Sequence, residues 1–171
     1  MKMHVRALVL LAVVGVLAVS AVGKDAPVPT GEVALTVSGT IALTNGDGVF
    51  AMDDALLRAL PQVAYFVEDP WMGGNTYGGV LLSTLLEYVG FPLGASQVVL
   101  VASDEKEFPI AIADALTYPI MLVMDDADGA LLPSLGGPIK VAYPYAAYPE
   151  VQTLYPPEQW AWWVVEVRIE Y

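Results

Sequence analysis

Residues 66–86, FVEDPWMGGNTYGGVLLSTLL, lead from an apolar segment through a glycine-rich segment into leucines at helical spacing. QVAYFVE (62–68) predicts a strand, because β-branched and aromatic residues favour extended backbone. VLLSTLLEYVG (80–90) predicts a helix that ends at Gly90, since its leucines recur every three or four residues. The segment between them, DPWMGGNTYGG (69–79), predicts a loop.

The rest of the chain predicts one domain in which strands outnumber helices. Apolar runs, alternating or continuous, predict strands at 33–39, 97–103, 107–112, 120–125 and 160–170. LGGPIKVAYP (135–144) predicts a glycine-rich approach to a strand that ends at Pro144. Short helices are expected over 53–60, with Asp53 as the N-cap, and around 113–116. Residues 144–158 contain four prolines and predict a long loop. We therefore predict an α+β domain over 33–171 with a mixed, mostly antiparallel sheet.

The N-terminus has the composition of a secretory signal peptide. Residues 1–23 contain two cations, an apolar run and then small residues, and the run is short for a membrane span. We expect cleavage after Gly23, a flexible segment at 24–32 and a periplasmic or secreted domain; an uncleaved anchor is the alternative.

Charge and cysteine content exclude several classes of function. From residue 24 onward the chain has five cationic side chains and 19 carboxylates, which would repel a nucleic acid. It has no cysteine, and its one histidine, His4, lies in the predicted signal peptide. A disulfide framework, a Cys–His zinc site and a histidine-dependent triad are therefore excluded.

Two glycine-rich segments are candidates for ligand binding. In the predicted loop, Trp71 and Tyr77 are suited to stacking on a ring, Asn75 to hydrogen bonding, and the glycines to close backbone approach. The alternative is a surface loop whose aromatic side chains fill the core. LGGPIK (135–140) can form an anion-binding nest with Lys140 beside it, although a lone lysine is more often solvated or ion-paired.

Two other clusters have simpler explanations. DDADG (125–129) lacks the spacing and the distal Glu of an EF-hand loop and predicts a β-turn, with calcium binding by its carboxylates as the alternative. Seven aromatic residues lie within residues 143–163, and core packing is their expected role, with a stacking platform or a partner surface as the alternative. If 160–170 were a regular strand, Trp160 and Trp162 would share one face and Trp163 would lie on the other. The seven are Tyr143, Tyr145, Tyr148, Tyr155, Trp160, Trp162 and Trp163.

The order of these segments resembles the molybdopterin-binding domain of the sulfite oxidase family. YGGVLLSTLL, VVLVASDEKEFPIAIADAL, IMLVMDDADGALLP and GGPIKVAYP, followed by the closing tryptophan strand, are similar to successive segments of that domain from about Val33 to Tyr171. The resemblance implies that domain's fold, and a pterin or molybdopterin as ligand.

The resemblance also includes two departures. Val67 stands where catalytic members have the cysteine that binds molybdenum, and Lys140 stands where they have an arginine. A valine offers no lone pair to a metal, so we expect no catalytic residue and no metal ligand from the protein. Small cysteine-free periplasmic members of this group imply a pterin-binding module that signals to a membrane partner, such as a cyclic-di-GMP enzyme or a sensor kinase.

This resemblance assigns roles to residues that the sequence alone leaves open. Asp104 is expected to bind the amino-pyrimidine edge of the pterin, and Lys140 a side-chain oxygen or phosphate. Two other functions stay open: a molybdopterin-dependent oxidoreductase whose metal is held by dithiolene and solvent, and a ligand-free interaction domain that docks through 144–158. The expected cofactor-binding residues are Trp71, Asn75, Tyr77, Asp104, Gly136, Gly137 and Lys140.

Overall fold

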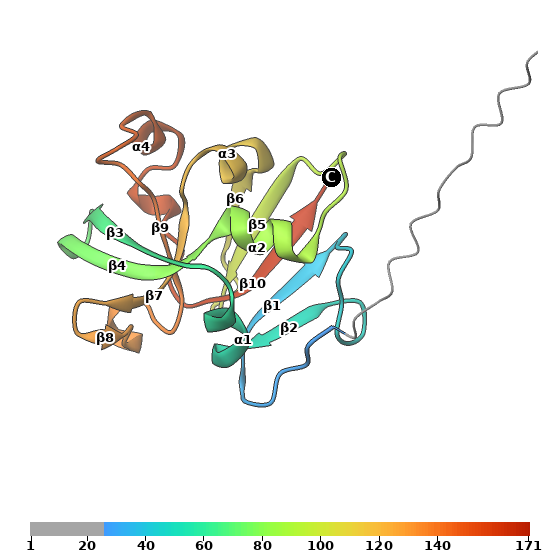
Figure 1. Ribbon diagram of the computed structural model, residues 1–171. Coiled ribbons are helices and arrows are strands. Elements are labelled where there is room, and N and C mark those ends of the chain that lie inside the picture. The colour runs from blue at the N-terminus through green and yellow to red at the C-terminus, as the bar shows by residue number, and fades with distance from the viewer. Residues whose placement is uncertain (1–25) are drawn as a thin grey trace, which may run out of the picture.

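The structure, a computed structural model, describes residues 26–171 and consists of two sheets with short helices between and around them (Figure 1). The predicted signal peptide and the first two residues of the predicted flexible segment lie outside the described residues. The prediction of an α+β domain with mixed, mostly antiparallel sheet is confirmed: only the pairing of β1 with β10 is parallel within the described strands.

The first sheet has the strand order β2-β1-β10-β5-β6. Its central pairing joins the two ends of the domain, because β1 near the N-terminus lies beside the last strand, β10. Its strands are β1 (Val33–Gly39), β2 (Phe50–Asp53), β5 (Gln97–Ala102), β6 (Glu107–Ala111) and β10 (Val164–Glu170).

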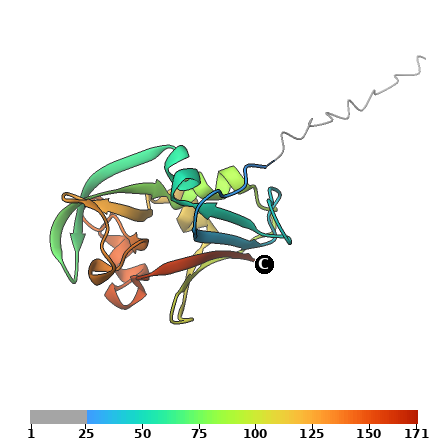
Figure 2. The same cartoon turned by 90° about the horizontal axis from the view of Figure 1, so that it is seen from below.

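The second sheet has the order β3-β4-β7-β8, with β9 paired to β7. The β3–β4 hairpin extends to the end of the molecule opposite the C-terminus, as Figure 1 and Figure 2 both show. Its strands are β3 (Gln62–Asp69), β4 (Gly73–Leu81), β7 (Met121–Asp126), β8 (Gly129–Ala130) and β9 (Lys140–Ala142).

The helices close the core between the sheets. The α-helices are α1 (Asp54–Ala59), α2 (Leu82–Val89), α3 (Ile112–Thr117) and α4 (Glu150–Leu154), and the 3-10 helices are η1 (Pro133–Leu135) and η2 (Pro157–Gln159). α2 packs on β4 and α3 and buries one apolar face, formed by Leu82, Leu85, Leu86 and Val89. No helix within residues 26–171 is long and apolar enough to cross a membrane.

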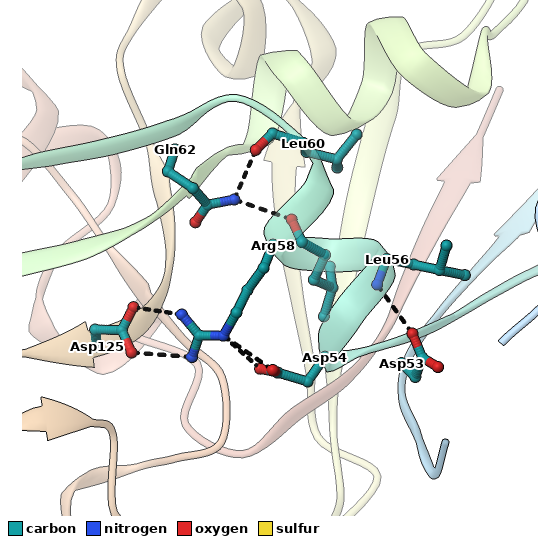
Figure 3. A network of polar contacts seen from close by, with 8 residues as sticks. Asp53, Asp54, Leu56, Arg58, Leu60, Gln62 and Asp125 are labelled. Atoms are coloured by element: carbon teal, nitrogen blue, oxygen red, sulfur yellow. Dashed lines mark hydrogen bonds and ion pairs between the residues drawn. The ribbon is translucent and has the colours of Figure 1, made fainter. Parts of the chain in front are cut away.

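α1 is tied to both sheets by polar contacts (Figure 3). Asp53 caps the helix by accepting a hydrogen bond from the Leu56 N–H, as predicted, and it also accepts from the N–H groups of Thr30 and Gly31. Arg58 forms a bidentate pair with Asp125 of β7, at 2.8 and 3.0 Å. These contacts fix the base of the β3–β4 hairpin next to β7.

Three predicted segments differ from the structure. The expected loop 69–79 is a turn followed by strand β4, and Gly79 lies against β7, where an added Cβ would stand 2.0 Å from the Leu122 carbonyl oxygen. The glycines here permit close packing of strands. Residues 144–158 contain α4 and the start of η2 instead of a continuous loop. The closing strand begins at Val164, because Trp163 has a φ of 54° and interrupts the extended backbone.

Candidate ligand-binding pocket

A pocket of about 470 Å³ lies where the turn before β4, the β5–β6 turn and the segment before β10 meet. We call it the aromatic pocket. Its walls are mostly tryptophan and phenylalanine rings, and its charged groups come from two carboxylates and one lysine. The lining residues are Trp71, Ala102, Asp104, Lys106, Phe108, Pro157, Glu158, Trp160, Trp162 and Trp163.

The backbone of Trp163 explains why three tryptophans so close in sequence line one pocket. Its left-handed φ of 54° breaks the alternation that would place neighbouring side chains on opposite faces. The Trp163 indole donates a hydrogen bond to the Pro133 carbonyl at 2.8 Å, and the rings of Trp162 and Trp163 meet edge to face with centroids 5.8 Å apart. Left-handed backbone at a bulky residue is unfavourable and tends to occur at binding sites.

The charged side of the pocket is formed by Asp104, Lys106 and Glu158. Lys106 lies 2.9 Å from Asp104, and its hydrogen bond to the carboxylate lowers the pKa of Asp104 below the usual value. Asp104 is therefore an ionised hydrogen-bond acceptor at neutral pH.

A buried cluster lies beside the Trp162 ring. Lys140 donates to Asp69 at 2.8 Å and to the Tyr77 hydroxyl at 2.9 Å, and Tyr77 donates to the same Asp69 oxygen at 2.9 Å. The Lys140 ammonium also lies 4.3 Å from the centre of the Tyr77 ring and 5.4 Å from that of Trp162. We call Lys140, Asp69 and Tyr77 the Lys140 cluster; none of the three lines the aromatic pocket.

Asp69 connects this cluster to the pocket. Its other carboxylate oxygen accepts hydrogen bonds from the N–H groups of Trp71 and Met72, at 2.8 and 3.0 Å. Burial acts to raise the pKa of Asp69, but the hydrogen bonds from Lys140 and the Trp71 N–H outweigh it and the pKa is lowered. Burial and the adjacent carboxylate raise the pKa of Tyr77, so its hydroxyl stays protonated.

Gly136 packs against Trp162, and Gly137 packs against the backbone of Leu131 and Leu132. A Cβ at Gly136, where φ is 95°, would stand 2.9 Å from the Trp162 ring. The Gly136 N–H donates to the Pro133 carbonyl and the Gly137 N–H to the Leu132 carbonyl. The predicted anion-binding nest is therefore occupied by the chain's own carbonyl oxygens.

The structure brings some of the predicted site residues together and separates others. Trp71 and Asp104, far apart in sequence, both line the aromatic pocket. Tyr77 and Lys140 lie in the buried cluster, and Asn75 lies on β4 opposite Val67, outside the lining.

Lys106, Phe108 and Glu158 line the pocket but were not predicted as site residues. Lys106 and Phe108 lie close to Asp104 in DEKEF, and Glu158 follows the proline pair at 156–157. Their closeness in sequence to Asp104 and to the tryptophans is the feature that could have identified them as site residues. Nothing in the sequence pattern shows that these two segments meet, because they belong to opposite ends of the domain's second half.

The residues present do not fit a molybdenum ligated by the protein. Val67, at the position implied for the cysteine, is an apolar side chain that is 1% exposed. Within residues 26–171 no group of three or more His, Cys, Asp or Glu side chains could hold a metal ion. Aromatic rings with an ionised carboxylate do fit a flat heterocycle with hydrogen-bond donors along one edge.

The fold is similar to that of a solved structure. The chain is similar to the crystal structure of the sulfane dehydrogenase SoxCD from Paracoccus pantotrophus, with a TM-score of 0.63 and 15% sequence identity. The match covers 80% of this chain and 37% of that chain. The likeness shows a shared fold.

No family model matches the sequence, and no curated protein matches it. The chain spans little more than a third of the SoxCD chain that it matches, 37%. The activity named for SoxCD therefore describes a much larger protein.

Proposed function

We propose that this protein is a periplasmic pterin-binding module, without molybdenum catalysis, that reports the bound pterin to a membrane-bound signalling protein such as a cyclic-di-GMP enzyme or a sensor kinase. The aromatic pocket is the observation that supports the proposal. It combines stacking surfaces with an ionised carboxylate, the two features that a pterin ring needs.

Each residue of the pocket has a role in this proposal. Trp71 and Trp162 provide apolar faces for the ring. Asp104 accepts hydrogen bonds from the amino group and the adjacent ring N–H of the pyrimidine edge. The Lys140 cluster positions Trp71 through Asp69, which binds the backbone of the Trp71 turn. Pterin itself supplies fluorescence and redox chemistry, and the chain supplies binding and orientation.

The turn that carries Trp71 gives the proposal a route to a partner. Trp71 is 56% exposed although it lines the pocket, and Met72 beside it is exposed as well. A ligand that stacks on Trp71 would restrict this turn at the outer end of the hairpin. A partner that contacts the turn would then distinguish the bound state from the free state.

The test is to purify the protein from the periplasm without added ligand, denature it, and analyse the released small molecules by fluorescence and mass spectrometry. Molybdenum is quantified in the same sample. The proposal predicts pterin without stoichiometric molybdenum. The absence of any pterin, together with no change in melting temperature when pterins are added, would contradict it, because a ligand at 100 times its dissociation constant stabilises by about 2.7 kcal/mol.

A Trp71→Ala variant tests the stacking role directly. Stacking of a heterocyclic base on an aromatic side chain contributes about 1–3 kcal/mol, so pterin affinity should fall by about 5- to 150-fold. Phe66→Ala is the matched control, since Phe66 is an exposed aromatic residue of the same hairpin outside the pocket. Equal affinity in Trp71→Ala and the unmodified protein would remove Trp71 from the site.

One observation favours a second function, a molybdopterin-dependent oxidoreductase. The similar structure is that of a dehydrogenase, and the fold is shared over most of this chain. In that case the metal would be held without a protein ligand at Val67. Molybdenum at near-stoichiometric level in the periplasmic sample would support this function over the first.

A further inference from the structure

We infer that the aromatic pocket binds a pterin that lacks a phosphate group and discriminates against phosphorylated pterins. This inference rests on the proposed function and specifies its ligand. It follows from the contacts that the possible phosphate-binding groups already make within residues 26–171. These groups are the N–H groups of the glycine nest and the cationic side chains.

The glycine nest is closed to an anion. Both N–H groups that would face the phosphate already donate to carbonyl oxygens, from Gly136 to Pro133 at 3.2 Å and from Gly137 to Leu132 at 2.9 Å. Carbonyl oxygen atoms also lie on the side of Gly137 where a side chain would stand. An added Cβ there would lie 2.0 Å from the Leu131 carbonyl oxygen. An anion placed there would meet negative dipoles instead of donors.

Lys140 is also unavailable. Its side chain is 0% exposed, and it is bonded to Asp69, which is equally buried. If Lys140 turned toward a phosphate, Asp69 would be left as an unpaired buried carboxylate, which is strongly unfavourable. The Trp162 ring also lies next to the ammonium group, 5.4 Å from it.

The other cations between residues 26 and 171 have carboxylate partners too. Arg58 pairs with Asp54 and Asp125. Arg168 pairs with Glu107 and Glu170. Lys106 is the one cation that lines the pocket; its pair with Asp104 is exposed, and its charge is outnumbered there by those of Asp104 and Glu158.

The pocket therefore has a charge that opposes a phosphate. Asp104 and Glu158 contribute two carboxylates and Lys106 one cation. A phosphate monoester carries a charge of about −1.5 to −2 near neutral pH, so it would add like charge to a site that already has an excess of it. A neutral pterin with an uncharged side chain avoids this repulsion and keeps the contacts of the ring.

The test compares two probes with the same ring, neopterin and neopterin 3′-monophosphate, by titration calorimetry on the mature chain at low salt. We expect neopterin to bind and its phosphate to bind at least about tenfold more weakly, as repulsion of about 1.4 kcal/mol requires. The difference should shrink in 1 M salt because exposed charges are then screened.

Variants separate the sources of discrimination. Glu158→Lys should strengthen binding of the phosphate relative to binding of neopterin by several fold, because it replaces a negative charge of the pocket with a positive one. Lys140→Met should change the affinity for both probes by the same factor. If the Lys140→Met variant does not fold, Asp69→Asn/Lys140→Met removes both buried charges and gives the same comparison.

Each outcome has a distinct meaning. Equal or tighter binding of the phosphate would overturn the inference while the pterin-binding function stands. Selective loss of phosphate binding in Lys140→Met would also overturn it, since the phosphate would then reach Lys140. If neither probe binds, the proposed function fails and the inference fails with it.

Discussion

Two lysine–aspartate pairs of nearly equal length lie near the same pocket in opposite environments. Lys140 and Asp69 are 2.8 Å apart and both 0% exposed, whereas Lys106 and Asp104 are 2.9 Å apart and 73% and 44% exposed. The distances alone would rank them as equivalent. Their burial shows that the first pair belongs to the core, whereas the second is exposed and lines the aromatic pocket.

The difference follows from solvation. An exposed pair exchanges water for a partner at little net gain, and its members separate easily when a ligand competes. A buried pair has lost its water on folding, so each member depends on the other. The chain thus holds one carboxylate in a buried pair and leaves another, Asp104, exposed at the aromatic pocket, where the proposed ligand would replace Lys106.

Lys140→Met should produce the largest effect on stability. Removal of one partner leaves Asp69 buried without its cation, which costs about 3–5 kcal/mol of unfolding free energy. Urea denaturation monitored by tryptophan fluorescence measures this loss. The double variant Asp69→Asn/Lys140→Met should recover much of it, because the asparagine oxygen can still accept from the Trp71 N–H. A loss below about 1 kcal/mol in the single variant would show that the folded state does not depend on the Lys140–Asp69 pair.

Gly136→Ala should have the next largest effect. The methyl group would clash with the Trp162 ring, and φ of 95° is unfavourable for alanine, so we expect a loss of about 2 kcal/mol and weaker pterin binding. Gly48→Ala is the matched control, because Gly48 has a φ of 79° and no atom within 4 Å of the added Cβ. The control should show the backbone cost alone. Equal losses in the two variants would mean that Gly136 does not position Trp162.

The pKa of Asp69 predicts a smaller, pH-dependent effect. Because the pKa is lowered in the folded state from 3.8, the carboxylate contributes stability above that value and the contribution is lost as pH falls through the folded-state pKa. The stability difference between the unmodified protein and Asp69→Asn should therefore be constant from pH 7 to about 5. Below about pH 4 it should decrease by less than about 1.4 kcal/mol per pH unit, since one proton is involved. A difference that grows on acidification would contradict the assignment.

The sequence predicted the strands and helices better than the tertiary contacts between them. The helix 80–90 and the N-cap at Asp53 follow from local spacing and side-chain chemistry, and both are present. The loop expected at 69–79 is largely strand β4, because its glycines are needed for packing against β7, a contact that only the tertiary structure reveals. Trp71 was selected from the glycine-rich segment and Asp104 from the family resemblance, and both line one pocket.

Lys140 shows the limit of sequence reasoning about sites. A glycine pair followed by a strand and a lysine is typical of anion binding, and that pattern is present here. Whether Lys140 is available to an anion depends on Asp69, which lies 71 positions away and forms a buried ion pair with Lys140. No local pattern reports such a pairing, so the same residues can describe a phosphate site or a buried ion pair.

Lys106→Ala should produce the smallest effect on stability and thereby complete the comparison. The exposed pair with Asp104 contributes little to the free energy of unfolding, so the midpoint of unfolding should hardly change. Loss of the Lys106 hydrogen bond moves the pKa of Asp104 back toward its usual value, where the carboxylate is still ionised at pH 7. Pterin binding should accordingly be retained or slightly strengthened, because the ligand no longer competes with the lysine for Asp104. A loss of stability as large as that of Lys140→Met would mean that burial does not determine how much each ion pair contributes to stability.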